Sequence, residues 1–587
     1  MPSWSLAQFT IKLNGSTAPA EMMKKVEEII VETNLHLPAM FSMRVVDPEL
    51  DWIDSSQLAI GTEVEVLVQA AARDGDRTSS TKVFSGEITA LEPSFGEAST
   101  SIQVRGYDKG HRLHRGRQQK AYLNISDSDM ASKLAGEVGL SPQVDATSEV
   151  YDHVIQNNLT NWEFLQERAR RIGYDCYVAD GKLHFKKIVT SGSAIELEWG
   201  NNLSRFQPRL STSGQVEEVN VRGWDPTKKE AIVGKATPRT EAEPAINVGG
   251  VGGQVAGGAF GGGAKMVIVD RPVHSAKEAD IMAQAIADDL GGNFVQADGE
   301  ADGNPQLRAG QKVTISNLGT RFSGDYFVTR ATHSFTGGEG YRVRFSVTGR
   351  RPMSVGSLLV GRKSLPDARM AGVVTAIVTN LDDPESQGRV KVKYPWLADD
   401  IESNWARVAS PMAGPERGFF WLPEVNDEVL IAFEHDDINY PYLLGSLWNG
   451  RDKPPAEKSD AVGSGGQVQQ RVIKTRDGHV IVLEDSPGGK PGIRIIDKTG
   501  NNQVLIDSGE NKITLEAAGD ITVQSKGKVI IKGDTGVEIE SGASLKASSK
   551  TDMSMEAKTT ATFKGSASVD VQASGQVNVK GSIVNIN

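Results

Sequence analysis

The C-terminal part of the chain repeats one eight-residue pattern of apolar and polar positions nine times. Every eighth position from Ile513 is apolar, and so is the position two places further on, while the positions between are mostly Thr, Gln, Lys, Glu, Ser and Asn. Each repeat predicts a short strand with alternate side chains inward, followed by a polar corner, and a fixed period of this kind is typical of a solenoid. The inward positions are Ile513, Ile521, Val529, Val537, Leu545, Met553, Ala561, Val569 and Val577 in the first register, and Leu515, Val523, Ile531, Ile539, Ala547, Met555, Phe563, Val571 and Val579 in the second.

An eight-residue period is too short for one chain to close a β-helix by itself. A single-chain β-helix needs roughly 18 or more residues per turn to build three faces from strands of this length, and one octad supplies only one face. The simplest closure uses three chains, each giving one face per layer, so that the inward residues meet on a threefold axis. We therefore expect residues 513–587 to form an intertwined trimeric β-helix, a stiff needle with layers about 4.8 Å apart.

Composition narrows the classes of protein to be considered. The 587 residues are enough for several domains, and 62 glycines with only 6% aromatic residues fit a β-rich chain with many turns. The formal net charge of −11 argues against general nucleic-acid binding. Cys176 is the only cysteine, so no intrachain disulfide can form.

The sequence carries no signal for export or membrane insertion. The N-terminus lacks a basic segment followed by an apolar run, and no stretch approaches ~18 uninterrupted apolar residues. We expect the protein to be made in the cytoplasm without a signal peptide. If the needle acts outside the cell or at a target envelope, a larger particle must deliver it.

The first two segments of the chain differ in their patterns. Residues 1–109 read as strands, interrupted by one helical stretch at 20–33, and we expect a first β-barrel there. Residues 110–210 contain two helical patterns, at 127–138 and 161–172, together with strands. We expect this second segment to be an α/β insert.

The second helix of the insert has clear start and stop signals. Thr160 or Asn161 can cap its N-terminus, and Gly173 can end it. An Asp-Gly turn at 180–181 then predicts a hairpin over residues 174–187.

A second β-barrel is expected over residues 211–350, with a helix at 276–290. Within it, residues 248–263 are rich in glycine. A phosphate-cradling loop would need a Gly-Lys-Ser/Thr ending and a strand-to-helix frame, which this segment lacks. We therefore expect a flexible surface loop here.

Residues 366–452 predict a compact barrel, and residues 453–512 a linker and neck. The barrel should have five or six strands, of which 371–380, 419–422 and 428–433 are examples. In the neck, pairs of apolar residues approach the octad spacing step by step. These pairs are Val480/Val482, Ile493/Ile495, Val504/Ile506 and Ile513/Leu515.

Three segments before the needle resemble one family. Residues 388–450, which include GRVKVKYPWLADD and ERGFFWLPEVNDEVLIAFEHDDINYPYLLGSLWNG, resemble the OB-fold barrel of VgrG and phage baseplate spike proteins. Residues 157–185 resemble the matching hub segment of VgrG and phage late-control D proteins, and residues 301–335 resemble their second hub barrel. The octads resemble the spike needle of the same family, so the resemblance covers most of the chain in the family's order.

The resemblance implies a mainly β fold with minor α: two hub β-barrels with a helical insert, an OB-fold barrel and a C-terminal intertwined trimeric β-helix. It also implies a non-enzymatic, homotrimeric central spike of a contractile injection machine, such as a phage tail, a type VI secretion system or an extracellular phage-tail-like particle. The hub would adapt the threefold spike to the sixfold inner tube and contact baseplate subunits. The needle would puncture the target membrane when the sheath contracts.

Carboxylate groups are the main candidates for chemistry. The pairs Asp382/Asp383, Asp399/Asp400 and Asp436/Asp437 all fall at predicted turns, whereas acid–base catalysis needs carboxylates in a cleft that separates their pKa values. We expect them to be solvated loop residues. Glu434 to Asp437 form the sequence Glu-His-Asp-Asp, but consecutive residues on a hairpin tip rarely converge on one metal ion. We expect no catalytic residue, cofactor or metal site.

The sequence KGHRLHRGR contains a basic patch that can be interpreted in two ways. A solvated charge run is the simpler interpretation, and a binding strip for the tube or a neighbouring baseplate subunit is the alternative. The patch consists of His111, Arg112, His114, Arg115 and Arg117.

Two other functions make different demands on the sequence. A spike-borne cell-wall hydrolase would need a catalytic domain between barrel and needle, but only residues 453–512 lie there, and most belong to the neck. A trimeric receptor-binding fibre would carry an aromatic-rich knob after the rod, and none is seen.

The last residues of the needle are expected to bind a separate tip protein. Some phage spikes end in a His-x-His pair that holds iron, but the last histidine here is His479, before the needle. A β-helix that stops at SIVNIN would expose strand edges and apolar surface, which proteins normally cover. We expect a PAAR-like tip protein to dock on Ile583, Val584, Asn585, Ile586 and Asn587.

Overall fold

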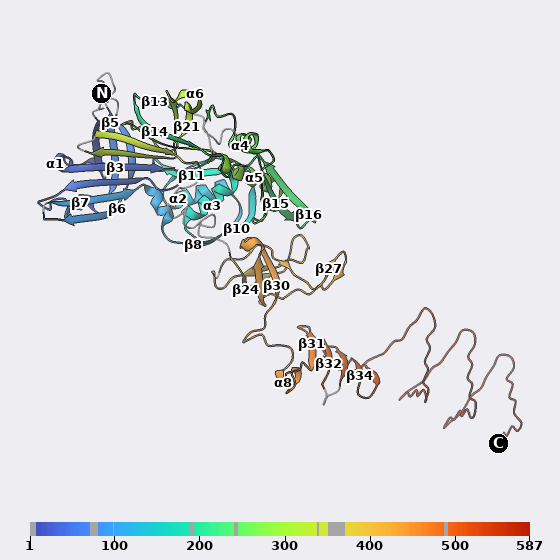
Figure 1. Cartoon of the computed structure of the whole chain (residues 1–587). Coiled ribbons are helices and arrows are strands. Elements are labelled where there is room, and N and C mark those ends of the chain that lie inside the picture. The colour runs from blue at the N-terminus through green and yellow to red at the C-terminus, as the bar shows by residue number, and fades with distance from the viewer. Residues whose placement is uncertain are drawn as a thin grey trace. The chain divides into compact units, whose positions relative to one another are not determined.

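The computed structural model divides the chain into two compact units, Met1–Lys453 and Pro454–Asn587 (Figure 1). The residues that it describes are 7–70, 80–97, 99–187, 193–239, 245–336, 340–349, 370–398, 400–486 and 491–586. In the first unit we call residues 7–349 the hub and residues 370–452 the barrel. In the second we call residues 470–516 the neck and residues 517–586 the needle segment.

An eleven-stranded sheet forms the centre of the hub (Figure 1). Alternate residues of its strands are apolar and buried, as Phe9, Ile11 and Leu13 are in β1 (Ala7–Leu13). Both segments for which we predict a barrel contribute strands, and β22 pairs with β3 to join them. The strand order is β14 (Leu203–Leu210), β19 (Val295–Asp302), β23 (Gly340–Val347), β22 (Arg330–Thr336), β3 (Val26–Asn34), β4 (Met40–Val46), β7 (Thr100–Tyr107), β6 (Thr81–Phe95), β5 (Glu63–Ala70), β1 and β2 (Ser16–Thr17).

The helix predicted over residues 20–33 is wrong beyond its first turn. Only α1 (Ala20–Lys24) is helical, and β3 begins two residues later. β3 lies between β4 and β22, where the β-branched side chains of Ile29, Ile30 and Val31 suit a pleated surface. Strand pairing on both sides therefore outweighs the local preference of this Glu-rich segment for a helix.

The α/β insert has a hydrophobic core of its own within the hub. The predicted helices, hairpin and stop signal are confirmed: Thr160 accepts a hydrogen bond from the backbone N–H of Glu163 (3.1 Å), and Gly173 has φ 72°. A glycine there ends the helix without the strain that a side chain would suffer. The elements of the insert are β8 (Gln118–Ser126), α2 (Asp127–Glu137), β9 (Ser141–Val144), β10 (Val150–Leu159), α3 (Asn161–Ile172), β11 (Tyr174–Ala179) and β12 (Lys182–Lys187).

Two smaller sheets complete the hub. In one of them, α5 (Ala276–Gly291) packs on β15 and β16 through a small apolar cluster that includes Val221, Ile232 and Met282, so the helix predicted over 276–290 is confirmed. This sheet has the strand order β16 (Glu230–Ala236), β15 (Glu218–Asp225), β18 (Lys265–Ile268). The other sheet has the order β13 (Ile195–Glu198), β20 (Lys312–Ser316), β21 (Gly324–Phe327), β17 (Ala245–Ile246). Short helical turns lie at Ser56–Leu58, Lys109–His114 and, as α6, Gly319–Phe322.

The glycine-rich segment 248–263, predicted to be a flexible surface loop, is partly helical. Its helix α4 (Gly252–Phe260) packs its first turn closely against residues 215–217. A Cβ atom on Gly253 would lie 2.2 Å from the carbonyl oxygen of Val216, a distance that real Cβ atoms do not reach. The prediction is wrong because these glycines serve close packing of a helix, which glycine content alone does not reveal.

Replacing Gly253 by alanine is expected to destabilise the hub. The added methyl group would push α4 off its support, and overpacking of this kind costs about 1–3 kcal/mol of unfolding free energy. Gly258 lies in the same helix with open space around it, so Gly258→Ala should leave stability unchanged or raise it by up to ~1 kcal/mol. Urea unfolding of the two variants compares them directly, and equal losses would show that α4 is not held by close packing.

The barrel has five strands, as predicted. Their order is β25 (Lys391–Lys393), β24 (Val373–Asn380), β29 (Glu428–Phe433), β30 (Pro441–Ser446) and β26 (Arg407–Val408), and backbone hydrogen bonds between Val390 and Ala406 close it. The strand predicted at 419–422 is wrong. Those residues follow a small hairpin, β27 (Ala413–Gly414) and β28 (Arg417–Gly418), and Phe419, Phe420 and Trp421 are exposed, so no sheet neighbour orders them.

The neck is an antiparallel meander of five strands, followed by an extended chain. The short helix α8 (Lys458–Ala461) precedes it. Beyond the neck, residues 517–586 form no strand among the residues that the structure describes, but paired bends recur every eight residues, first at 518–519 and last at 582–583. The strands are β31 (Gln470–Lys474), β32 (Val480–Glu484), β33 (Gly492–Ile496), β34 (Gln503–Asp507) and β35 (Lys512–Glu516).

Candidate assembly surfaces

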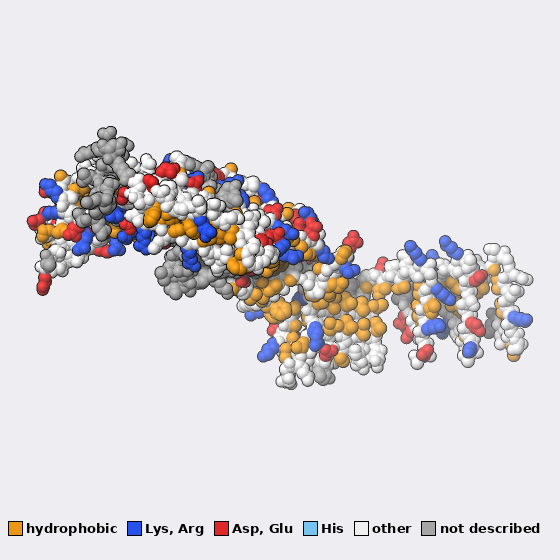
Figure 2. Space-filling model, turned by 45° about the horizontal axis from the view of Figure 1, so that its top comes forward, with side chains coloured by type: hydrophobic (Ala, Val, Ile, Leu, Met, Phe, Trp, Pro, Cys, Tyr) orange, Lys and Arg blue, Asp and Glu red, His pale blue; other side chains and the backbone are white. Residues whose placement is uncertain are grey.

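The neck presents one continuous apolar face to solvent. Cross-strand partners point to the same side of a sheet, and the register pairs Ile481 with Ile495, Ile493 with Ile506, and Val504 with Leu515. Of the seven residues of this face before β35, six are 36–48% exposed and Val504 is partly exposed. Hydrophobic side chains gather over this part of the chain in Figure 2. We define the apolar neck face as Ile473, Ile481, Leu483, Ile493, Ile495, Val504, Ile506, Ile513 and Leu515.

One of the four apolar pairs noted in the neck sequence does not belong to this face. Val480 and Val482 belong to the opposite face, where Val482 is buried beside Arg494. The apolar residues that continue the exposed face in β32 are Ile481 and Leu483. Since all four residues are apolar, the sequence does not fix the register, and a shift of one residue exchanges the two faces of a strand.

The octad residues lie in the extended needle segment and are uncovered in the single chain. The needle segment forms no backbone–backbone hydrogen bond among its described residues, and in Figure 1 it winds in open turns. Its large inward octad side chains, of a kind that protein folds normally bury, are 50–75% exposed. They are Ile521, Val523, Val529, Ile531, Val537, Ile539, Leu545, Met553, Met555, Phe563, Val569, Val571, Val577 and Val579.

The predicted tip residues are also uncovered. Ile583, Val584 and Ile586 are 80%, 49% and 91% exposed. Asn585 is exposed too, and Asn587 lies outside the described residues. The docking of a tip protein on them stays a prediction.

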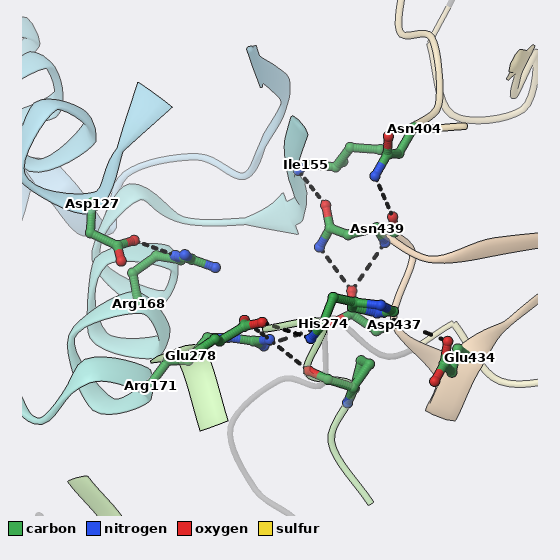
Figure 3. A network of polar contacts seen from close by, with 11 residues as sticks. Asp127, Ile155, Arg168, Arg171, His274, Glu278, Asn404, Glu434, Asp437 and Asn439 are labelled. Carbon is green, nitrogen blue, oxygen red and sulfur yellow. Dashed lines mark hydrogen bonds and ion pairs between the residues drawn. The ribbon is translucent and has the colours of Figure 1, made fainter. Parts of the chain in front are cut away.

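A polar network joins the hub to the barrel, with Arg171 of α3 at its centre (Figure 3). Its Nη2 donates to Oε1 of Glu278 in α5 (2.7 Å) and to the carbonyl oxygen of Pro272 (2.8 Å), while Nη1 lies 3.9 Å from Oδ2 of Asp437 in the barrel. The Arg171 and Glu278 side chains are 14% and 9% exposed. Burial alone would lower the pKa of Arg171 and raise that of Glu278, but the facing charges reverse both shifts, so the pair is ionised.

A second set of contacts fixes the barrel loop that carries Asp437. Asn439 accepts a hydrogen bond from the backbone N–H of Ile155 in β10 (2.8 Å), and its Nδ2 donates to Oδ1 of Asp437 (2.8 Å). The ring of His274 stacks on Tyr440, with centroids 4.1 Å apart. Hub and barrel thus meet through three separate hub segments: a hydrogen bond from Ile155, the Arg171 guanidinium near Asp437, and the His274 ring, whose Nε2 lies 4.0 Å from Oε2 of Glu434 (Figure 3).

Apolar packing supports the same junction. Ile155 belongs to the hub strand β10, but it is 3% exposed and packs with the barrel core residues Ala376 and Ile431. Two residues earlier, Nε2 of His153 donates to the carbonyl oxygen of Glu402 in the barrel (2.7 Å). The contacts between hub and barrel are therefore both apolar and polar.

Two of the carboxylates singled out in the sequence, Asp383 and Asp437, have structural contacts, whereas Asp382 and Asp400 are exposed as predicted. Asp383 is not a solvated loop residue. Although burial opposes its ionisation, hydrogen bonds from the Arg389 side chain and from neighbouring backbone N–H groups hold the pKa of Asp383 well below its usual range. Asp437 lies in the junction, and Asp399 is outside the described residues. In the described part of the chain, no three His, Cys, Asp or Glu side chains are placed to hold a metal ion.

The basic patch is largely occupied by contacts within the hub. His111 and Arg112 both contact Glu87, and Arg117 donates to the carbonyl oxygen of Asn158 (2.6 Å). His114 stacks on Trp162. Arg112, His114, Arg115 and Arg117 are nevertheless exposed, so the binding strip considered as an alternative stays a prediction.

The sequence does not identify the junction residues. Arg171, Glu278 and Asp437 are separated by more than a hundred residues each. Of the three, only Asp437 stands out in the sequence, as a member of a carboxylate pair and of a Glu-His-Asp-Asp sequence, and not as a partner of Arg171. The one available signal was local: Arg171 belongs to a helix with apolar residues on its inner face, where a buried arginine needs an anionic partner.

Acid is expected to destabilise the hub through His333. Nδ1 of this residue lies 2.8 Å from the Tyr341 hydroxyl, and burial lowers the pKa of His333 to about 3. The neutral form is favoured in the folded hub, so its contribution is complete above pH 6.5 and is lost as pH falls from 6.5 toward 3. At pH 5 the loss should be about 2 kcal/mol. Urea unfolding gives the unfolding free energy at pH 7.5 and at pH 5, and the difference between the two should be about 2 kcal/mol smaller in His333→Gln than in the parent chain. An equal difference in the two proteins would contradict the assignment.

Two family models match the chain. The model of the Alg8 N-terminal domain matches residues 3–337, more than half of the chain, and that of the type VI secretion system/phage-baseplate injector OB domain matches residues 374–448. The chain belongs to the VgrG and phage-baseplate spike family, with an N-terminal part of the Alg8 type. The second match coincides with the five-stranded barrel, so the predicted barrel type is confirmed.

Among the curated relatives of this chain are spike proteins of type VI secretion systems and one toxin. The chain is 33% identical over 131 residues to spike protein VgrG5 of Pseudomonas aeruginosa, which covers 19% of this chain and 17% of that relative. It is 31% identical over 180 residues to spike protein VgrG4b of the same organism. That match covers 29% of this chain and 20% of VgrG4b. The actin cross-linking toxin VgrG1 of Vibrio cholerae matches over 171 residues with 27% identity, 26% of this chain and 15% of the toxin. The spike protein thus spans a fifth or less of the length of these relatives.

Solved structures share the fold of the spike protein. The Francisella PdpA–VgrG complex in its lidded form aligns with a TM-score of 0.51 at 8% identity, over 88% of this chain and 81% of that chain. The lidless form aligns with a TM-score of 0.50 at 8% identity, over 88% and 98%. No helix among the described residues of the spike protein is long and apolar enough to span a membrane.

Proposed function

We propose that this spike protein is the homotrimeric central spike of a contractile, phage-tail-like injection machine. One observation carries the proposal: the inward octad residues are 50–75% exposed along an extended segment whose bends recur every eight residues. Three copies related by a threefold axis would cover these side chains and supply hydrogen-bond partners for the extended backbone. The apolar neck face supports the same arrangement, because it adjoins the first octad through Ile513 and Leu515.

The hub and barrel would carry the needle. We propose that the hub adapts the threefold needle to the sixfold inner tube and contacts baseplate subunits, and that the junction around Arg171 transmits the load of contraction. Since the structures that share the fold are PdpA–VgrG complexes, we propose that this chain also assembles with other proteins, a PAAR-like tip protein among them. The needle would act mechanically, puncturing the target membrane at the envelope, with no reaction of its own.

The mass of the native protein tests the proposal. A trimer has three times the 63.1-kDa mass of the chain, and an intertwined needle should keep the three chains together on an SDS gel without boiling. A monomer under native conditions would overturn the proposed spike. Particles assembled with a chain truncated after residue 516 should still contract but should no longer release dye from target vesicles, whereas undiminished release would overturn membrane puncture by the needle.

A further inference from the structure

The charges of the needle segment show a regularity at one-octad spacing. Wherever two charged residues stand eight positions apart between Lys512 and Lys580, the two charges are opposite in six of seven cases. At a spacing of sixteen, only two of five such pairs are opposite. The opposite pairs at eight are Lys512/Asp520, Asp520/Lys528, Lys526/Asp534, Lys532/Glu540, Glu538/Lys546 and Glu556/Lys564.

These charges have no ionic partner in their own chain. In residues 517–586, all of which are described, the structure contains no ion pair, and every charged residue is exposed. The exception to the rule, Lys550/Lys558, lies at two of the recurring bends, as the opposite pair Lys526/Asp534 also does. Lys532, Glu540, Glu538 and Lys546 lie between the bends, next to inward octad residues, and therefore point outward on a strand.

A three-chain needle brings residues eight apart together from different copies. All three chains wind in the same direction, so the strands stacked on one face run parallel and in register. After eight residues a chain turns onto the next face, where it lies on the preceding octad of its neighbour. Residue n of one copy then faces residue n+8 of the next copy, about 4.8 Å away along the ladder.

On the basis of the proposed trimer, we infer that these charges form an inter-chain ladder that sets the register of the three copies. The partner is a second copy of this chain, displaced by one octad. A displacement of two octads would place Lys512 on Lys528, Glu540 on Glu556 and Lys564 on Lys580. Like charges directly opposite each other on neighbouring strands are destabilising. The apolar columns are nearly alike in every octad, so charge is the feature that distinguishes one register from another.

The same chain is the other candidate partner. Residues 24 apart carry opposite charges in six of eight cases, and they would meet if one chain stacked on itself after three octads. In the described needle segment, however, no strand pairs with another, and the turns are open (Figure 1). In the three-chain ladder, residues 24 apart lie three strands apart, about 14 Å, where salt screens most of their interaction.

Charge reversal in the full-length chain tests the ladder. Lys532→Glu places two glutamates together and Glu540→Lys two lysines, so each should speed dissociation of the trimer in SDS about tenfold, because each trimer contains three such contacts. The double variant K532E/E540K restores an opposite pair and should return to within about twofold of the original rate. Lys580→Glu is the matched control: it occupies the same outward position of its octad, but its neighbour is Gln572, and its rate should not change.

The outcomes separate the ladder from the trimer itself. If the single variants dissociate as slowly as the parent trimer, or if the double variant dissociates as fast as the single variants, the ladder is overturned. The trimer itself is not affected by either result. A monomeric parent chain overturns the trimer. In 1 M NaCl the difference between the single variants and the parent should shrink, since these pairs are exposed to solvent.

Discussion

Replacing Val523 by aspartate is expected to abolish the trimer that we propose. Val523 is an inward octad residue, and threefold symmetry would bring three aspartates together on the axis between layers of apolar residues. A carboxylate that is buried without a partner costs several kcal/mol, and here three like charges would share one site. The loss should therefore exceed that from any exposed position of the needle segment.

Thr522→Asp is the matched control for this prediction. Thr522 is the preceding residue, belongs to the same strand and points to the outer surface in the predicted alternation. Native mass and unboiled SDS gels should show a stable trimer for the parent chain and for Thr522→Asp, and separate chains for Val523→Asp. Equal behaviour of the two variants would mean that the inward and outward positions are wrongly assigned.

Features set by residues close together in the sequence could be predicted from it. Helix α3 is correct to the residue because its cap, Thr160, and its stop, Gly173, act within one turn of the helix ends. The bends of the needle segment recur at the predicted period because every octad repeats the same inward and outward alternation. The inward assignment of individual octad residues still awaits a measurement on the assembled protein.

Features set by distant neighbours could not be predicted. Residues 26–33 have a helical pattern but form a strand, because β4 and β22 pair with both of its edges. The first turn of α4 depends on the space beside Val216. The face of β32 depends on a one-residue register that four apolar residues in succession leave open.

The two kinds of surface have different physical roles in the proposed spike. The apolar neck face and the octads are exposed in one chain, so their burial would depend on the other copies, and assembly would itself be a folding step. The Arg171 junction is complete within one chain. A force on the needle would therefore meet inter-chain contacts first and intrachain contacts afterwards, and the junction must be strong enough for the barrel to stay on the hub.

Replacing Arg171 by methionine is expected to lower the unfolding free energy of the hub and barrel by about 3–5 kcal/mol. Glu278 would keep its charge in a site where its side chain is 9% exposed, and a buried charge that loses its partner is strongly destabilising. Asp437 of the barrel would lose the same cation. Urea unfolding of the full-length chain, together with limited proteolysis between hub and barrel, measures both losses.

Two further variants show whether the unpaired charge is the cause. In R171M/E278Q the glutamine removes the charge but can still accept the hydrogen bond that the backbone N–H of His274 donates to Glu278 (3.0 Å), so much of the stability should return. Lys120→Met breaks an ion pair of the insert whose two side chains are about a third exposed, and it should cost less than about 1 kcal/mol. If Arg171→Met costs no more than Lys120→Met, the junction is an ordinary surface contact, and the load from the needle must enter the hub by the apolar packing around Ile155 alone.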